Sequence, residues 1–436
     1  MTHLYKTCMF ALFAGFALTT TSTAFAQETA SDASFRDLIA AELGSNGGGL
    51  TADEVARRAL RTSPSVRARG EELLAAAADV DRAVSAYVPE VVLGASYTRL
   101  SDTSGPALAL PNLPPLDFQT PLDQYALTAS LSVPVSDYFF RVRPNHEGAK
   151  LGETAANEQL RAEKQTAAAD ARLAYYDWVR ARLNLVVARQ ALAQAEGHLA
   201  DSRTGLAAGT LSQADVLRIE SEVARSELLV TSSQNLAELT EEQLRTIMHD
   251  DPRRGYRIGE DVRQPAPTKN TSRLEELWAE AQRSRPELRA LDAQRGALEW
   301  TTAADKAQYG PRLDLVGGAA YANPNSRIFP PEDAFRGSWE AGARLTWVIS
   351  DVPGTAATVR GGEARSRALA AERAALGDRI RLEVMSAFQE RAEARVAEGT
   401  TMRRLVSAEE SYRTRRLLFQ NGRATTVELL DAETDL

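Results

Sequence analysis

Three histidines and two pairs of adjacent carboxylates are the side chains whose types could support catalysis or metal binding. His146, His198 and His249 lack the HExxH spacing of a zinc site, and no cysteine stands near them to complete one. The carboxylate pairs at 71–72 and 409–410 lie in highly charged segments, which are typical of solvated helix faces. These residues therefore do not predict an active site or a metal site.

Motifs for nucleophilic catalysis and for phosphate binding are missing as well. The sequence has no GxSxG elbow and no Walker A loop. The glycine-rich stretch 44–49 neither follows a strand nor fits GxGxxG, which favours a flexible linker. A net charge of -8 and a pI near 5.4 give no basic surface for nucleic acid. We expect no enzyme activity, no cofactor, no metal and no nucleic-acid partner.

Residues 1–26 have the pattern of a secretory signal peptide. A lysine precedes the apolar run 9–18, and Ala24-Phe25-Ala26 is a small-x-small cleavage site. The run is about half of the roughly 20 apolar residues that a membrane-spanning helix needs, and no later segment approaches that length. We expect export, with a mature chain that begins near Gln27 and has lost Cys8, the single cysteine.

An internal repeat organises the 436 residues. A shift of 222 positions aligns Ala59, Pro64, Val66, Tyr87, Pro89 and Leu93 with Ala281, Pro286, Leu288, Tyr309, Pro311 and Leu315. Shifts of 214 and then 213 align Leu131, Val133, Val135 and Asp137 with Leu345, Trp347, Ile349 and Asp351, and Gly209, Asp215 and Leu217 with Gly422, Glu428 and Leu430. Loop-length differences explain the drift, so the sequence predicts two copies of one unit.

Two segments in each copy alternate strictly between apolar residues and polar or small ones, which predicts β-strands. The apolar positions are Val91, Leu93, Ala95 and Tyr97, then Tyr125 to Val135 at every second residue, and in the second copy Leu313, Leu315, Ala319 and Tyr321, then Trp339 to Ile349 at every second residue. Strands of about 9 to 11 residues with aromatics near their ends match those of a transmembrane barrel. A half-buried soluble sandwich gives the same alternation.

Long helices distinguish these alternatives. A helix is predicted over 51–86, with Thr51 and Glu54 at capping-box spacing. A proline-free helix over 145–202 would reach roughly 85 Å at 1.5 Å per residue, and a turn at 205–209 leads into a returning helix that ends at Met248. Its heptad seam consists of Val216, Ile219, Val223, Ser226, Val230, Ser233, Ala237, Thr240, Leu244 and Ile247. An ordinary coiled coil has such a seam, but between barrel-type hairpins these helices are expected to form the walls of a channel.

Backbone pairing in lipid adds a constraint. A membrane sheet cannot leave its edges open, and four strands are fewer than the practical minimum of about eight for a barrel. Several copies must therefore pool their hairpins around a water-filled lumen. The side chains expected to face lipid are Val91, Leu93, Tyr97, Tyr125, Leu127, Leu131, Val133, Leu313, Leu315, Tyr321, Trp339, Leu345 and Trp347.

The sequence resembles the TolC-like outer membrane efflux protein family, the exit ducts of multidrug pumps and type I secretion systems. The most specific part is the pair of helix-turn-helix tips, AGTLSQADVL at 208–217 and NGRATTVELLDAE at 421–433, and the resemblance covers essentially the whole mature chain. It implies a mainly α fold with transmembrane β-strands: a homotrimer whose chains each give four strands to a shared 12-strand β-barrel, above a tunnel of long antiparallel α-helical hairpins. It also implies a place in the outer membrane of a Gram-negative bacterium, extending into the periplasm. The implied partners are outer membrane lipid, a periplasmic adapter (membrane fusion) protein and an inner-membrane pump.

The resemblance also suggests site residues at the tips. In the family a valine precedes each tip glycine, where this chain has Ala208 and Asn421. The implied adapter contacts are Ala208, Gly209, Thr210, Leu211, Asn421, Gly422 and Arg423. Asp215 matches a family aspartate whose links hold the tunnel shut, and Glu428 is its repeat mate; a carboxylate favoured by the helix dipole is the alternative for both. Candidate gate partners nearby are Arg203, Tyr412, Arg413 and Arg416, for which solvated surface positions are the alternative.

The predicted domain order follows the repeat: signal peptide 1–26, flexible linker 27–49, first repeat 50–248 with its β-hairpin at 89–136, an equatorial linker 249–272 packed as a belt around the helices, and second repeat 273–436 with its β-hairpin at 311–350. The helix that would match 223–248 in the second repeat is absent, so either the sequence is a fragment or the second hairpin lacks its returning arm, and the need for a complete wall favours a truncated sequence. The predicted function is a passive outer membrane exit duct of a tripartite efflux pump or type I secretion system, carrying small molecules or proteins. A periplasmic adapter normally has one helical hairpin, and a coiled-coil scaffold leaves the strand aromatics unexplained; these are the alternatives.

Overall fold

The computed structural model describes residues 38–43, 49–101, 121–251, 253–264 and 273–436. They form two compact units: the first lies within 1–63 and 167–268, and the second within 64–166 and 269–436. The predicted signal peptide and most of the proline-rich loop between the first two strands lie outside the described residues. Among the helices that the structure describes, none is both long enough and apolar enough to cross a membrane.

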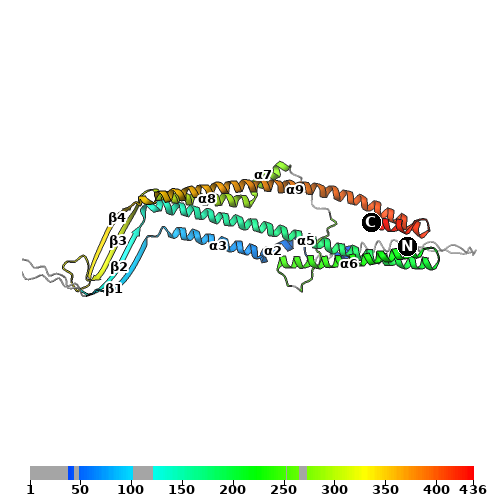
Figure 1. The fold of residues 1–436 in the computed structure, drawn as a ribbon, viewed down its shortest axis with the longest axis horizontal. Helices are drawn as coiled ribbons and strands as arrows, with labels where there is room; N and C mark the ends of the chain where they lie inside the picture. The colour runs from blue at the N-terminus through cyan, green and yellow to red at the C-terminus, as the bar shows by residue number, and fades with distance from the viewer. Residues whose placement is uncertain (1–37, 44–48, 102–120, 252, 265–272) are drawn as a thin grey trace, which may run out of the picture. The chain divides into compact units, whose positions relative to one another are not determined.

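The elements follow one another in the order expected of a doubled unit (Figure 1). The first copy has α2 Ala52–Thr62, α3 Pro64–Ser85, β1 Glu90–Arg99, β2 Asp123–Val133, α4 Val135–Asp137, the π-helical turn η1 Tyr138–Val142, α5 Arg143–Ala207 and α6 Gln213–Met248. The second copy has α7 Leu274–Ser284, α8 Pro286–Lys306, η2 Ala307–Tyr309, β3 Arg312–Asn323, β4 Arg336–Thr346, η3 Ile349–Asp351, α9 Val352–Gln420 and α10 Thr426–Asp435.

The four strands form one antiparallel sheet in chain order, β1-β2-β3-β4 (Figure 1). The two predicted hairpins lie side by side because β2 pairs with β3, with Leu127 opposite Tyr321. The register keeps like faces together, since Ala95 lies opposite Leu127 and Ala319 lies opposite Trp339. The predicted fold class, mainly helical with two β-hairpins in a doubled unit, is confirmed.

Two predicted strands end earlier than expected. Val135 was expected in a strand but belongs to α4, because Pro134 has no N–H for the ladder. Trp347 and Ile349 lie beyond β4, whose last pair is Arg312 with Thr346. The residue before Arg312 is Pro311, which again cannot donate to the ladder. The assignment of Trp347 to a strand was therefore wrong.

The predicted helix over 51–86 is also divided in two. Ser63, with φ -57° and ψ 121°, interrupts it because the proline at position 64 disfavours a helical conformation in the residue before it. Thr51 caps α2 as expected, accepting a 3.2 Å hydrogen bond from the N–H of Glu54. The Glu54 carboxylate binds Arg57 and Arg58 instead of returning to the cap, so only half of the predicted capping box forms.

The first long helical hairpin matches its prediction closely. In the first unit the end of α5 and the antiparallel α6 run side by side (Figure 1). Every residue of the predicted heptad seam of α6 is buried or half-buried, whereas Leu228 and Leu239, outside the seam, are 69% and 56% exposed. α6 ends where His249 takes a left-handed conformation, φ 52°.

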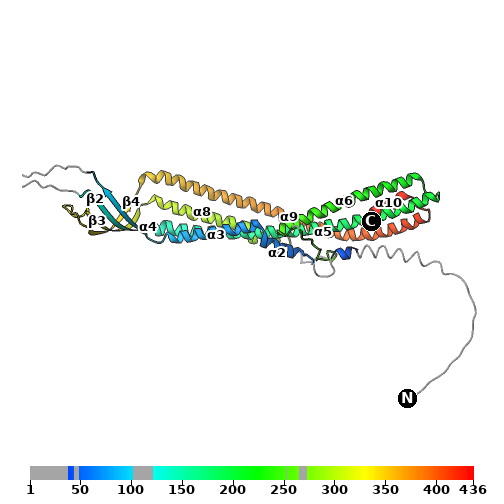
Figure 2. The same cartoon turned by 90° about the horizontal axis from the view of Figure 1, so that it is seen from below.

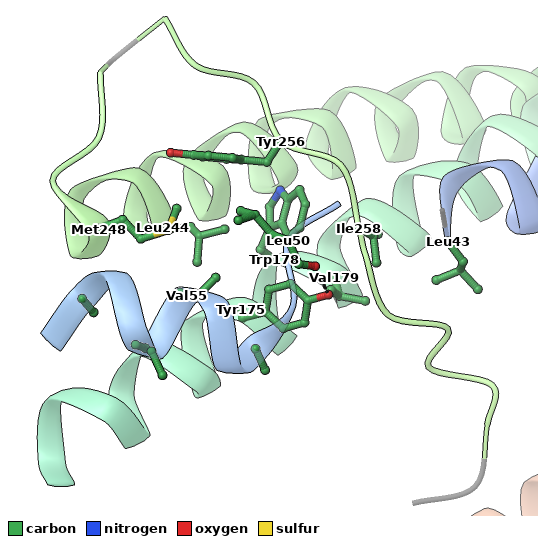
Figure 3. Packing of buried hydrophobic residues seen from close by; sticks show 14 residues of the cluster. Leu43, Leu50, Val55, Tyr175, Trp178, Val179, Leu244, Met248, Tyr256 and Ile258 are labelled. Atoms are coloured by element: carbon green, nitrogen blue, oxygen red, sulfur yellow. Dashed lines mark hydrogen bonds between the residues drawn. The ribbon is translucent and has the colours of Figure 1, made fainter. Parts of the chain in front are cut away.

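The first unit has a core that ties the chain before α2 and the predicted linker to these helices (Figure 3). Trp178 and Tyr175 of α5 are fully buried among Leu50, Ile258 and Tyr256. Leu50 and Ile258 form a parallel bridge, so the described part of the predicted belt does pack on the helices. Leu43 is 2% exposed in the same core, so a flexible linker over 27–49 was wrong for residues 38–43 and for Gly49, whose backbone touches the chain beside Ile258.

In the second unit, α8 and the first part of α9 pack along each other (Figure 2). Ala281 at the end of α7, Leu288 of α8 and Ile380 of α9 form a small buried cluster. The short helix α10 folds back onto α9 after a tight turn. This second turn repeats the geometry of the turn between α5 and α6.

Candidate functional site

The sheet presents a continuous apolar face that nothing within its unit covers. Leu93 is 77% exposed, Trp339 is 74% exposed and Leu345 is 68% exposed. The three registers put all of the predicted lipid-facing residues within the strands on this face. Trp347 lies just past β4 and is 53% exposed. An exposed apolar surface of this extent marks contact with a membrane or with another protein.

Aromatic rings gather where the sheet connects to its hairpin loops. Tyr97 lies 5.0 Å from Tyr125, which lies 6.1 Å from Phe335, and Phe335 stacks on Tyr321 at 5.2 Å between ring centroids. The Tyr97 hydroxyl donates a 2.8 Å hydrogen bond to Asp123, which belongs to the last pair of the β1–β2 ladder. Aromatic rings beside charged groups are typical of the membrane–water interface of a barrel.

The opposite face of the sheet is polar. It carries hydroxyl groups along β1 and β2, such as Ser130, and charged groups on β3 and β4. Arg312 donates a 2.8 Å hydrogen bond to Asp314, which is 7% exposed. Arg327, in the loop between β3 and β4, pairs with Glu340. A face of this kind suits an aqueous lumen.

The two longest helices of the described chain, α5 and α9, end in the same tip motif, which comes first after α5. Gly209 has φ 73°, and the N–H of Thr210 donates to the carbonyl of Gly205 at 2.9 Å, which is the pattern of a Schellman cap. The next helix then begins with a complete capping box. The N–H of Ser212 donates to Asp215 Oδ2 at 3.1 Å, and the N–H of Asp215 donates to Ser212 Oγ at 3.3 Å.

The second tip repeats this arrangement 213 positions later. Gly422 has φ 68°, and the N–H of Arg423 donates to the carbonyl of Leu418 at 2.8 Å. Thr425 and Glu428 form the capping box, with the N–H of Thr425 donating to Glu428 Oε2 at 2.8 Å. The expected adapter-contact residues Ala208, Gly209, Thr210, Asn421, Gly422 and Arg423 are all exposed, and Leu211 is half-buried.

The candidate gate carboxylates bind within their own tips. Hydrogen bonds from the hydroxyl and backbone N–H of Ser212 hold the pKa of Asp215 below its ordinary value. Those from Thr425, together with Arg415, lower the pKa of Glu428. These contacts agree with the alternative interpretation, in which both groups cap helices, and they do not test a role in gating.

The other gate candidates have different neighbours from those expected. Arg203 pairs with Glu220 of α6 at 2.9 Å and not with Asp215. Arg413 pairs with Glu410 one turn earlier on α9. Tyr412 and Arg416 lie half-buried on the same helix.

Sequence reasoning overlooked five residues that build the tips. They are the cap residues Ser212 and Thr425 and the ion-pair partners Glu220, Glu410 and Arg415. The caps had a readable signal, because serine or threonine followed three positions later by a carboxylate marks a helix start. The ion pair of Arg415 with Glu428, at 2.8 Å, had no comparable signal. Within the described residues, no cluster of three or more histidine, cysteine or carboxylate side chains is placed to hold a metal.

The sequence matches the outer membrane efflux protein family over residues 55–248 and 277–436, and the chain belongs to this family. The two matched segments correspond to the two copies of the repeat. A comparison with curated proteins finds no significant match.

Solved outer membrane channels share the fold. The channel OprN has a TM-score of 0.73 and 19% identity, covering 91% of this chain and 89% of its own. CusC has a TM-score of 0.74 and 17% identity, covering 88% and 86%. VceC from Vibrio cholerae has a TM-score of 0.72 and 18% identity, covering 88% and 89%.

Family membership defines the class of function. The chain is an outer membrane exit duct of the efflux type, in the outer membrane of a Gram-negative bacterium and extending into the periplasm. The family is one of transport channels and not of enzymes. Its channels generally form trimers and work with adapter and inner-membrane pump partners.

Proposed function

We propose that this chain is one subunit of a homotrimer whose three sheets close a single 12-strand barrel. The observation that carries the proposal is the pair of sheet edges, on β1 and β4, that have no neighbour in the described chain although the sheet has an exposed apolar face. In lipid, each unpaired backbone N–H or C=O costs several kcal/mol, and closure removes that cost. Three copies of four strands give a barrel well above the minimum size.

The transport step in this proposal is passive. An inner-membrane pump delivers cargo through a periplasmic adapter into the tunnel of helical hairpins, and the cargo leaves through the barrel. The polar face, with Ser130 and Glu340, supports a hydrated lumen that offers no single binding pocket for one substrate. Cargo selection then belongs to the pump, and small molecules or proteins fit the same duct.

The two tips are the proposed adapter contacts. Their turn residues, apart from the half-buried Leu211, are exposed and held by capping on both sides, so each presents a rigid loop to a partner. Asp215 and Glu428 are the proposed gate carboxylates. Each has one oxygen engaged in its capping box, which leaves the other oxygen of Asp215 available to a group from a neighbouring subunit.

The mass of the full chain in detergent tests the trimer. After extraction of the outer membrane, we expect a particle with the protein mass of three mature chains and channel activity in planar bilayers. A monomer that appears in the periplasmic wash without detergent would overturn the duct assignment and favour the adapter or scaffold alternative.

A separate variant tests the gate. Asp215→Asn keeps an oxygen for the Ser212 N–H but removes the charge, and we expect it to raise the resting conductance of the purified trimer. The matched control is Asp201→Asn, an exposed carboxylate near the end of α5 outside the tip hydrogen bonds. Conductance that is equal in the two variants removes Asp215 from the gate.

A further inference from the structure

The open edges of the sheet determine how neighbouring copies must join. Because β1 and β4 run in opposite directions at opposite edges, β4 of one copy meets β1 of the next as an antiparallel pair. We propose that they pair with Ala341 opposite Ala95 of the neighbouring copy. The inference rests on the proposed trimer and specifies its subunit interface.

The two faces of the sheet restrict the possible registers. Successive residues of a strand point to opposite faces, so a slip of one residue would put apolar side chains into the lumen. Odd-numbered residues of β1 and β4 form the apolar face, as with Leu93 and Trp339, and even-numbered residues form the polar face. Odd residues must therefore meet odd residues across the subunit boundary, and only registers that differ by two residues remain.

The strand pairings within one chain define which residues of the four strands lie at the same level. The offset between neighbouring copies is counted from that level. Glu90 lies opposite Ser132, Ser132 lies opposite Val316, and Val316 lies opposite Gly342. A ring with no offset would place Gly342 opposite Glu90 of the next copy. The residues 343–346 of β4 would then have no partner, which lipid does not allow.

An offset of four residues pairs the two edges completely. Gly342 then lies opposite Gly94 of the neighbouring copy, and all of β1, Glu90–Arg99, faces residues of β4. An offset of two leaves Leu345, Thr346 and Arg99 without partners in the facing strand. An offset of six places Glu90 opposite residue 348, beyond the end of β4.

The tilt of the strands supports the same register. Three copies with an offset of four give a stagger of about 12 residues around 12 strands. With about 3.3 Å per residue and about 4.8 Å between strands, the tilt is about 35°, within the range of about 35–45° for barrels. Offsets of two and six give about 19° and about 46° by the same geometry.

The contacts that result are chemically compatible. Trp339 meets Tyr97 of the neighbouring copy on the lipid side and so joins the cluster of aromatic rings to which Tyr97 belongs. Cross-strand aromatic pairs of this kind are favourable. On the lumen side Arg344 lies diagonal to Glu90 of the neighbouring copy, within reach of long side chains. Arg344 has no ion pair within the part of the chain that the structure describes, and Glu90 interacts there with Arg312 at longer range, so the proposed interface supplies a closer partner for each.

Cysteine pairs in the full-length protein test the register directly. The single native cysteine, Cys8, lies in the predicted signal peptide, so we expect no native cysteine to compete with the introduced pairs. A341C/A95C and E340C/S96C match the proposed register on the two faces of the sheet. Both are needed, because adjacent antiparallel positions alternate between wide and close spacing and disulfides form at the close one. The controls A341C/L93C and A341C/Y97C match offsets of two and six.

After mild oxidation of membranes, we expect most of the protein from at least one matched pair to run as a covalent trimer on non-reducing gels, with the controls remaining monomeric. A trimer linked through L93C or Y97C, or no link in either matched pair, overturns the register while the detergent mass still reports a trimer. A monomeric mass overturns the proposed trimer itself.

A charge swap provides an independent readout. R344E and E90R should each lower the temperature at which the trimer dissociates in detergent, and the double variant R344E/E90R should recover most of the loss. Two losses that simply add in the double variant would show that these side chains do not meet, which overturns the register.

Discussion

The hydroxyl of Tyr175 donates a 2.8 Å hydrogen bond to the carbonyl oxygen of Leu50, 125 residues earlier in the chain. Tyr175 is fully buried, and Leu50 also bridges Ile258 of the linker between the repeats. Burial raises the pKa of Tyr175 well above its ordinary value. One side chain of α5 thus ties the start of the first repeat, and through Leu50 the linker that follows this repeat, to the helices (Figure 3).

Removing this hydroxyl should destabilise the first unit. Tyr175→Phe leaves the ring in place but removes one buried hydrogen bond, with an expected loss of about 1 kcal/mol. The adjacent Tyr176→Phe is a matched control, because its hydroxyl reaches Glu260 at an exposed position. Urea unfolding of the two variants measures the difference, and equal midpoints would contradict a structural role for the Leu50 contact.

The tip glycines should resist substitution for backbone reasons alone. Gly209 has φ 73° and nothing within 4 Å of the position that a Cβ would occupy, so Gly209→Ala would meet strain but no clash. The left-handed conformation costs an L-residue about 1–2 kcal/mol. Gly197→Ala, also without a nearby atom but inside α5, should instead stabilise by about 0.5–1 kcal/mol. Hydrogen exchange at the tip should accelerate in the first variant only; slower exchange in both would refute the argument.

Acid should loosen the two tips. Cap hydrogen bonds favour the ionised forms of Asp215 and Glu428 and hold the pKa of each below its ordinary value. For a lowered pKa, the stabilisation is complete above the ordinary value and is lost as the pH falls through the lowered value. Amide exchange of α6 and α10 near their first turns should therefore rise below about pH 4, after correction for the intrinsic pH dependence of exchange. Ser212→Ala should remove most of this acid sensitivity from the first tip, and an unchanged profile would show that the cap does not cause it.

Sequence patterns predicted the parts of this fold that depend on local periodicity. The alternation of Leu93, Ala95 and Tyr97 identified the apolar face because side-chain direction in a strand does not depend on distant contacts. The heptad of α6 identified its seam for the same reason. Strand ends at Pro134 and Pro311 and the break at Ser63 were also readable, since proline restricts the residue before it and donates no hydrogen bond.

Other features needed three-dimensional information. The contact between Tyr175 and Leu50 joins positions 125 residues apart, and neither residue type indicates which residue it will contact. Arg203 has several carboxylates within reach along its helix pair, so its pairing with Glu220 depends on helix rotation and side-chain rotamers. The packing of Leu43 was missed because its short segment adjoins a glycine-rich stretch. The site is thus predictable as a pair of capped turns, but its ion pairs are not.

Adjacent residues in the middle of β2 should respond in opposite ways to a charge. Leu127 is 54% exposed on the apolar face, and Thr128 belongs to the polar face. An arginine that faces lipid near the bilayer midplane costs about 2–4 kcal/mol, whereas lumen positions tolerate charge. Leu127→Arg should therefore reduce the amount of assembled trimer in the outer membrane, and Thr128→Arg should assemble normally and shift the channel toward anion selectivity. Reversal potentials in planar bilayers and heat-resistant trimer on gels measure the two effects. Normal assembly of Leu127→Arg together with failure of Thr128→Arg would mean that the apolar face is turned toward the lumen, because only that orientation exchanges the environments of the two side chains.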